Sequence, residues 1–180
     1  PRDSDTEGEA NFEIQFSDLA GNEGTLITAS TNNTKVIFDK TPPADFAVGL
    51  LTPTGGNQVD GMWNLTNTGM DIMIPVANDT TLKNGTVQIF GKVGSNDFEP
   101  IGSISNILSN DIDGNKTISI SGALIEGLTG FTEGQKIYIK SMMTDRPGNI
   151  TEGAQSITEI LIDETPASIT SISILSSNNN

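Results

Sequence analysis

The chain has 180 residues and carries a net charge of −14 at pH 7, from 23 acidic and 9 basic side chains, with no histidine and no cysteine. Without His or Cys, the sequence excludes a Ser-His-Asp triad, a Cys-His nucleophile, a disulfide and an ordinary zinc site. The acidity argues against nucleic acid and anionic membranes as partners, because both attract basic surfaces. No apolar run approaches the roughly 18 residues of a membrane span, so we expect no membrane insertion.

In chain order, alternating apolar runs predict strands at residues 12–16, 25–28, 35–38, 47–51, 62–65, 70–76, 87–93, 101–107, 118–120, 136–143 and 157–162. Asn84-Gly85 lies between two of these runs and predicts a tight hairpin. Pro75 indicates an edge strand or a strand end, and residues 123–128 favour a short helical turn. The chain is also rich in Ser, Thr, Asn and Gly, which are poor helix formers. These features predict an all-β protein with an antiparallel β-sandwich.

The most informative feature is an internal match. Residues 16–22 align with residues 143–149 and share Asp-x-x-Gly-Asn, and the two copies are 127 residues apart. Residues 36–43 align with residues 160–167 and share Asp-x-Thr-Pro, at a spacing of 124 residues. Two elements that match in the same order indicate repeated units of similar length.

This match sets the expected domain boundaries. Residues 1–39 are interpreted as the C-terminal half of one domain, and the proline-containing residues 40–43 as a linker. Residues 44–163 then form a complete domain. Residues 164–180 are expected to be a second linker and the first strand of a following domain, with alternation from Ile169 to Leu175.

The repeated motifs resemble the end of a bacterial immunoglobulin-like repeat. The segments 62–69, 74–79 and 85–89 resemble a long variety of such repeats, and residues 5–18 resemble a second variety. The resemblance implies immunoglobulin-like β-sandwiches in tandem, as found in large secreted or cell-surface proteins including adhesins. Arg146-Pro147 departs from the pattern, which more often has a small residue before the glycine of the turn.

Four aspartates are candidate ligands. Asp18 and Asp145 head the two repeated turns, where each side chain is expected to cap its own turn by accepting main-chain N–H groups. The alternative is a Ca²⁺ site that Asp18 or Asp145 shares with Asp39 or Asp163 at the interdomain joints, because hard cations prefer oxygen ligands. Calcium is therefore the one cofactor that the sequence suggests.

Two other features have a structural and a functional interpretation. Residues 111–115 carry oxygen donors at three positions of an EF-hand-like loop. The loop has Lys116 in place of the glycine and Gly122 in place of the last glutamate, so a plain turn is expected. Trp63 could stack on a sugar, but a tryptophan between two sheets is the more common arrangement.

These observations predict a non-catalytic spacer repeat in a long extracellular or cell-surface bacterial protein, such as an adhesin stalk or a fibre. Its partners would be neighbouring immunoglobulin-like repeats, and head-to-tail self-assembly through the two partial domains is a further hypothesis. The alternative is a module that binds a glycan or cell-surface ligand, in an adhesin or beside a secreted polysaccharide-degrading enzyme. No enzymatic activity is expected, since a repeat without large insertions offers no cleft for a pair of catalytic carboxylates.

Overall fold

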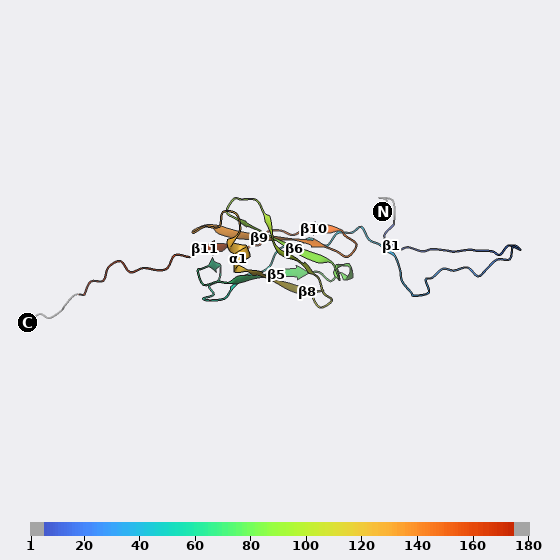
Figure 1. Cartoon of the computed structure of the whole chain (residues 1–180), viewed down its shortest axis with the longest axis horizontal. Coiled ribbons are helices and arrows are strands. Elements are labelled where there is room, and N and C mark those ends of the chain that lie inside the picture. The colour runs from blue at the N-terminus through green and yellow to red at the C-terminus, as the bar shows by residue number, and fades with distance from the viewer. Residues whose placement is uncertain (1–5, 175–180) are drawn as a thin grey trace, which may run out of the picture.

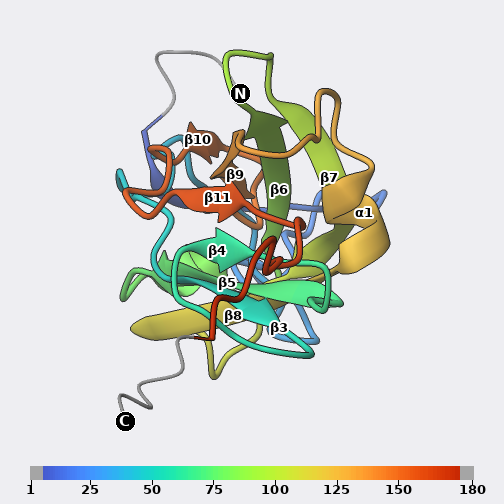
Figure 2. The ribbon, with the colours of Figure 1, turned by 90° about the vertical axis from the view of Figure 1, so that its left-hand side faces the viewer.

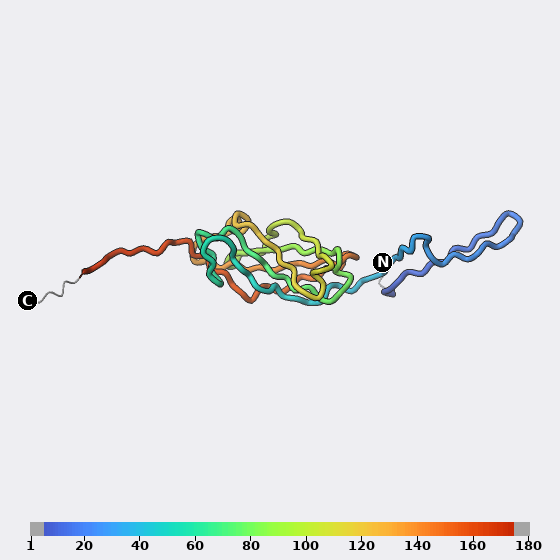
Figure 3. Tube along the Cα trace, turned by 90° about the horizontal axis from the view of Figure 1, so that it is seen from below, coloured from blue at the N-terminus to red at the C-terminus, as the bar shows by residue number. Residues whose placement is uncertain are grey.

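The computed structural model describes residues 6–174, which form three parts (Figure 1). An extended arm, residues 6–38, lies at one end. The joint segment, residues 39–43, connects it to a two-sheet body, residues 44–163, and residues 164–174 leave the body at the opposite end (Figure 1, Figure 3). The all-β prediction is confirmed, because strands dominate the described residues and α1 (Gly122–Glu126) and the 3₁₀ turn η1 (Thr80–Leu82) are short.

Two sheets form the body within residues 6–174 (Figure 2). The larger contains β4 (Met62–Trp63), β11 (Ile160–Ile162), β9 (Lys136–Thr144), β6 (Thr86–Val93) and β7 (Glu99–Asn106) in this order, with β10 (Ile150–Glu152) paired to β9. The smaller has the order β3 (Leu51–Thr54), β5 (Gly69–Val76) and β8 (Gly114–Ser121). In the arm, β1 (Gly8–Glu9) pairs with β2 (Ile37–Phe38).

The core lies between the two sheets because alternate residues of each long strand point inward. On β6 the inward positions are Val87, Ile89, Gly91 and Val93, as the alternation predicts, and all four are buried. Trp63 is fully buried and forms a T-shaped pair with Phe131, with ring centroids 6.5 Å apart. Each such large apolar side chain contributes about 1.5–3 kcal/mol when it leaves water, so the inner faces hold the sheets together.

One feature of the predicted topology is wrong: the larger sheet is mixed rather than purely antiparallel. β11 pairs in parallel with β4, with Leu161 opposite Met62 and Ile162 opposite Trp63. Near the joint segment, Ala47 forms a parallel bridge with Ala154. Both pairings join residues about a hundred positions apart, and local alternation carries no information about which distant strand becomes a neighbour.

The hairpin predicted at Asn84-Gly85 is also wrong. β5 and β6 lie in different sheets, and η1 and this dipeptide carry the chain from one sheet to the other. Asn84 does adopt a left-handed conformation, with φ of 66°. Gly85 lies so close to the Thr144 carbonyl that a side chain would clash with it, so the dipeptide serves tight packing between sheets.

Pro75 lies in the central strand of its sheet, not in an edge strand, but it is the penultimate residue of β5. Pro75 is paired with Asn115 of β8, but its nitrogen lies on the other side of the strand, the side from which the Met73 N–H donates to the Leu50 carbonyl. The register of β3 with β5 ends at Ile72, so no β3 residue lies opposite the missing N–H. The expected strand at residues 47–51 is instead a bridge at Ala47 followed by β3. The expected helical turn at residues 123–128 is confirmed by α1.

The arm has less regular structure than its alternation predicts. The runs at residues 12–16 and 25–28 meet only at isolated bridges, Ile14 with Ile27 and Ser17 with Glu23. Their apolar side chains are exposed, Phe16 by 53% and Ile14 by 51%. A lone two-stranded ribbon has no second layer to cover its apolar face, so these residues lack the core that stabilises the body.

Residues 164–174 form no strand in the structure, and the last residue of the predicted alternation, Leu175, lies outside the described residues. Ile169, Ile172 and Ile174 are exposed. A strand needs a neighbour to pair with, so a first strand at this position stays a prediction. In the described part of the chain, no helix has the length and apolar character needed to cross a membrane.

Candidate functional site

The joint segment is bound from the arm side by one carboxylate. Pro42 and Pro43 have no N–H groups, so few donors remain in this segment. The Lys40 N–H donates to Glu7 Oε1 at 2.9 Å, and the Thr41 hydroxyl donates to the same oxygen at 2.9 Å. These bonds hold the pKa of Glu7 below its usual 4.5, with the Thr41 hydroxyl as the main cause and the Lys40 N–H next.

The body binds the same segment through two side chains of the β9–β10 hairpin. The Asn149 side-chain amide donates to the Asp39 main-chain carbonyl at 3.3 Å, and the Thr151 hydroxyl donates to the Pro43 carbonyl at 2.5 Å. The Thr151 side chain is buried. The joint segment therefore makes hydrogen bonds to both parts that it connects.

Asn149 is oriented by the turn at residues 145–149, which joins β9 to β10. The buried Asp145 carboxylate accepts the Gly148 and Asn149 N–H groups on Oδ1, both at 2.7 Å, and the Asn149 side-chain amide on Oδ2 at 2.8 Å. Asn149 thus bridges the carboxylate of its own turn and the carbonyl of the joint segment.

The arm contains the same turn at residues 18–22. Asp18 Oδ1 accepts the Ala20 and Asn22 N–H groups at 2.9 Å, and Oδ2 accepts the Asn22 side-chain amide at 2.8 Å. The hydrogen bond from the Asn22 side chain is the main cause that lowers the pKa of Asp18, followed by that from the Asn22 N–H. The prediction that Asp18 and Asp145 cap their own turns is confirmed.

The structure brings together only two of the four candidate calcium ligands. Asn149 connects Asp145 with the main chain of Asp39, whereas Asp18 lies in the arm and Asp163 follows β11 at the far end of the body. In Asp39, Oδ1 accepts the Thr41 N–H at 3.0 Å and Oδ2 is buried with no hydrogen-bond partner. Within residues 6–174 no three acidic side chains are grouped as a metal would require, and calcium binding stays a prediction.

The exit from the body repeats one contact of the joint segment. The Glu164 N–H donates to Glu133 Oε2 at 2.8 Å, just as the Lys40 N–H donates to Glu7. Glu164 and Lys40 occupy the same position after the aspartate of Asp-x-Thr-Pro. Glu133 was not predicted from the sequence, although Thr-Glu-Gly occurs both at residues 6–8 and at residues 132–134.

The loop at residues 111–115 and Trp63, for which the sequence offered a functional alternative, both have structural roles. Asp111 and Lys116 form an ion pair at 3.2 Å, and both are only 8% exposed. Asp111 Oδ2 also accepts the Leu108 N–H at 2.8 Å, so this loop is a turn closed by its own polar groups. Trp63 belongs to the core, as expected, and offers no surface to a sugar.

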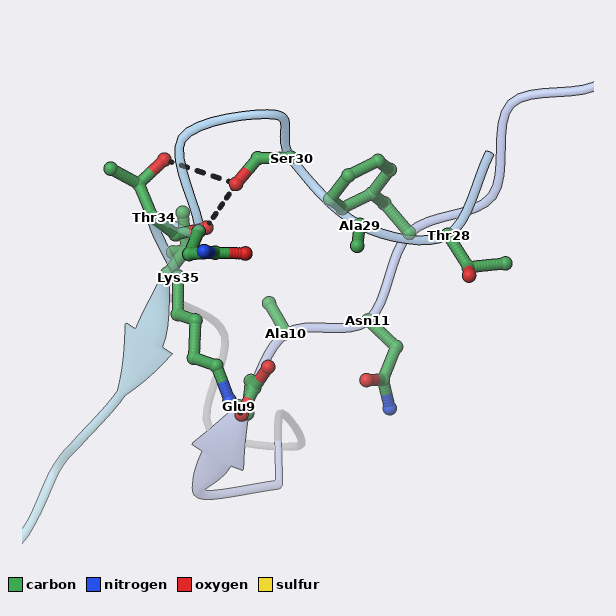
Figure 4. A pocket seen from close by; sticks show the side chains of 11 residues that line it. Glu9, Ala10, Asn11, Thr28, Ala29, Ser30, Thr34 and Lys35 are labelled. Atoms are coloured by element: carbon green, nitrogen blue, oxygen red, sulfur yellow. Dashed lines mark hydrogen bonds and ion pairs between the residues drawn. The ribbon is translucent and has the colours of Figure 1, made fainter. Parts of the chain in front are cut away.

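A hollow lies between the two sides of the arm near its base (Figure 4). Ser30 and Thr34 are hydrogen-bonded across the adjacent turn, and Lys35 forms an ion pair with Glu9 at 2.7 Å. The charges of Lys35 and Glu9 in this hollow therefore compensate each other.

The outer face of the larger sheet carries lysines stacked on aromatic rings. The Lys92 ammonium lies 4.8 Å from the ring centre of Phe98 and 5.3 Å from that of Tyr138. The Lys140 ammonium lies 4.7 Å from the ring centre of Phe98 and 5.7 Å from that of Phe90. All five side chains are partly exposed. We call these five residues the lysine–aromatic face.

No protein-family model, curated protein or solved structure matches the chain. The family resemblance therefore stays a prediction.

Proposed function

We propose that the chain is a non-catalytic spacer, made of immunoglobulin-like β-sandwich units in tandem, in a long bacterial surface or secreted protein. The observation that carries this proposal is the direction of the chain through the body. The chain enters at the joint segment and leaves after β11 at the opposite end (Figure 1). A unit with entry and exit at opposite ends adds its full length to the span of a longer array.

The terminal pairings of the body also suit a spacer under tension. Near the entry, residues 46–48 run parallel to the segment that contains Ala154. The Val48 N–H donates to the Ala154 carbonyl at 3.2 Å, and the Ala154 N–H donates to the Phe46 carbonyl at 2.8 Å. Tension on the chain pulls residues 46–48 toward the N-terminus and the Ala154 segment toward the C-terminus. In a parallel pair these pulls oppose each other along the strands, so the bonds are loaded together in shear and do not open one after another.

The contacts at the two ends support a tandem arrangement. The Glu7 carboxylate accepts the N–H of Lys40, the residue after Asp39. The Glu133 carboxylate accepts the N–H of Glu164, the residue after Asp163. The turns at residues 18–22 and 145–149 also have matching internal hydrogen bonds. Repeated contacts of this kind are expected where one unit follows another with a constant joint. The net charge of −14 adds self-repulsion that keeps such an array extended.

Pulling the single chain from its ends tests the proposal. Because the sequence has no native cysteine, Thr6→Cys and Ser173→Cys provide two unique attachment points for force spectroscopy. We expect one abrupt unfolding event that releases about 400 Å of contour length, from a body of ~120 residues at ~3.5 Å each. Gradual extension at low force, with no discrete event, would contradict the spacer function.

A second candidate function is a binding module for a glycan or another surface ligand, and the lysine–aromatic face favours it. Aromatic rings stack on the faces of sugar rings. Ammonium groups attract the negative charge of acidic sugars. The matched test compares Tyr138→Ala with Phe16→Ala, an exposed aromatic of the arm, on an array of neutral and acidic glycans. Binding that Tyr138→Ala removes and Phe16→Ala retains supports this function, and an array without any signal rejects it.

A further inference from the structure

We propose that the turn at residues 18–22 is a docking site for an Asp-x-Thr-Pro segment of another unit of the same kind. In this contact the Asn22 side-chain amide donates to the main-chain carbonyl of the incoming Asp. The inference rests on the proposed tandem function, for which it names the contact that sets one unit against the next.

The filled example is the joint of this chain. A side-chain amide of asparagine has two N–H donors. In Asn149 one donor goes to Asp145 Oδ2 at 2.8 Å and the other to the Asp39 carbonyl at 3.3 Å. The first bond orients the amide, and the second binds the Asp-x-Thr-Pro segment.

The arm has the same amide with one donor left over. Asn22 donates to Asp18 Oδ2 at the same 2.8 Å. Across residues 6–174, no acceptor takes its second side-chain N–H. Both Asp18 and Asn22 are exposed, so the turn is open to an incoming segment.

The exit of the body presents the complementary acceptor. The Asp163 N–H donates to the Trp63 carbonyl at 2.8 Å, and the next N–H, that of Glu164, is held by Glu133 at 2.8 Å. These bonds fix the main chain on both sides of the Asp163 carbonyl. In the described part of the chain that carbonyl accepts no hydrogen bond, whereas the equivalent carbonyl of Asp39 is bound by Asn149.

One contact of the filled joint has no counterpart in the arm. Thr151, which binds the Pro43 carbonyl, corresponds to Gly24 in the repeat, and glycine has no hydroxyl group. Docking at residues 18–22 is therefore expected to be weaker than the joint of this chain. Covalent linkage of successive units would compensate, because it raises the effective concentration of the Asp-x-Thr-Pro segment near the turn.

Limited proteolysis tests whether the amide holds a joint segment. Trypsin cleaves after Lys40 in the joint segment and after Lys35 in the arm, so the second site is an internal reference. We expect Asn149→Ala to raise the ratio of Lys40 to Lys35 cleavage about fivefold, for the loss of one net hydrogen bond. Asn22→Ala removes the matching turn bond without touching the joint and should leave the ratio unchanged. An equal ratio in both variants overturns the role of the amide.

Peptide titration tests the open turn itself. The probe is a capped peptide with the sequence of residues 162–167, Ile-Asp-Glu-Thr-Pro-Ala, added to the ¹⁵N-labelled full chain at roughly 5 mM, a concentration suited to millimolar affinity. We expect the side-chain amide signal of Asn22 to shift and that of Asn149, which is already occupied, to stay. An unmoved Asn22 signal overturns the docking site. The force experiment is independent of this amide, so the spacer function can stand if docking fails.

Discussion

The Asn149 side-chain amide lies 3.3 Å from the main-chain carbonyl of Asp39, a residue 110 positions earlier. This contact joins the turn after β9 to the segment through which the chain enters the body. With Thr151 and Glu7 it gives the joint segment hydrogen-bond partners on both sides. A linker bound in this way is held in one geometry, unlike a linker whose polar groups face only water.

The Thr151 hydroxyl gives the first prediction. Thr151→Val keeps the shape of the side chain but leaves the Pro43 carbonyl without its buried donor. We expect the free energy of unfolding to fall by about 1–3 kcal/mol, measured by urea denaturation. Thr117→Val, at an exposed position of β8, is the matched control and should change it by less than about 0.5 kcal/mol. Equal effects at both positions would contradict a role for Thr151 in the joint.

The core gives the second prediction. Ile139 is fully buried on β9, whereas Ile104 on β7 is 63% exposed. Ile139→Ala should lower the free energy of unfolding by about 2–5 kcal/mol, because it removes packed methyl groups and leaves a cavity. Ile104→Ala should cost less than about 0.5 kcal/mol. Similar losses in thermal or urea unfolding would mean that β9 does not face the core.

The ion pair between Lys116 and Asp111 gives the third prediction. Asp111→Ala leaves the Lys116 ammonium buried without its partner, and the free energy of unfolding should fall by about 3–5 kcal/mol. Glu152→Ala breaks the ion pair with Lys140, in which the Glu152 side chain is 63% exposed, and should cost at most about 1 kcal/mol. The double variant Asp111→Leu, Lys116→Met should recover most of the loss. No recovery would indicate that the two charges do not act as a pair.

The fourth prediction concerns pH. The Thr41 hydroxyl and the Lys40 N–H bind the ionised form of Glu7 and lower its pKa below 4.5. For a carboxylate with a lowered folded-state pKa, the stabilisation is fully present above the unfolded pKa and is lost as the pH falls through the folded pKa. The Lys40 amide signal in NMR should therefore move only below about pH 4.5. Glu7→Gln should abolish this titration, and an unchanged titration in that variant would assign it to another group.

The fifth prediction concerns calcium. The buried Asp39 Oδ2 has no hydrogen-bond partner, and Asn149 links the Asp39 main chain to Asp145. If Ca²⁺ binds at this joint, millimolar Ca²⁺ raises the melting temperature through mass action on the folded state. Asp39→Asn should reduce that rise, and Asp18→Asn, in the arm, should not. A melting temperature that does not respond to Ca²⁺ ends the calcium hypothesis.

The candidate joint was only partly predictable from the sequence. The internal match identified the two turns and the two Asp-x-Thr-Pro segments, because both rest on short runs of turn-forming residues. Glu133 was missed, since one charged residue among 23 acidic ones carries little signal until its hydrogen bond to Glu164 is seen. Asn149 was recognised as part of a turn, but its bond to Asp39 crosses 110 residues and no local pattern reports it.

By itself, the sequence determined the all-β class, the inward positions of β6, and the capped turns at Asp18 and Asp145. Each of these depends on neighbours a few residues away, through the alternation of side chains along a strand or a carboxylate that binds nearby N–H groups. Only the tertiary structure decided that β11 runs parallel to β4, that Asn84-Gly85 passes between sheets, and that Asn149 binds the joint segment. These features join residues far apart in the chain, and their partners are selected by packing of the whole core.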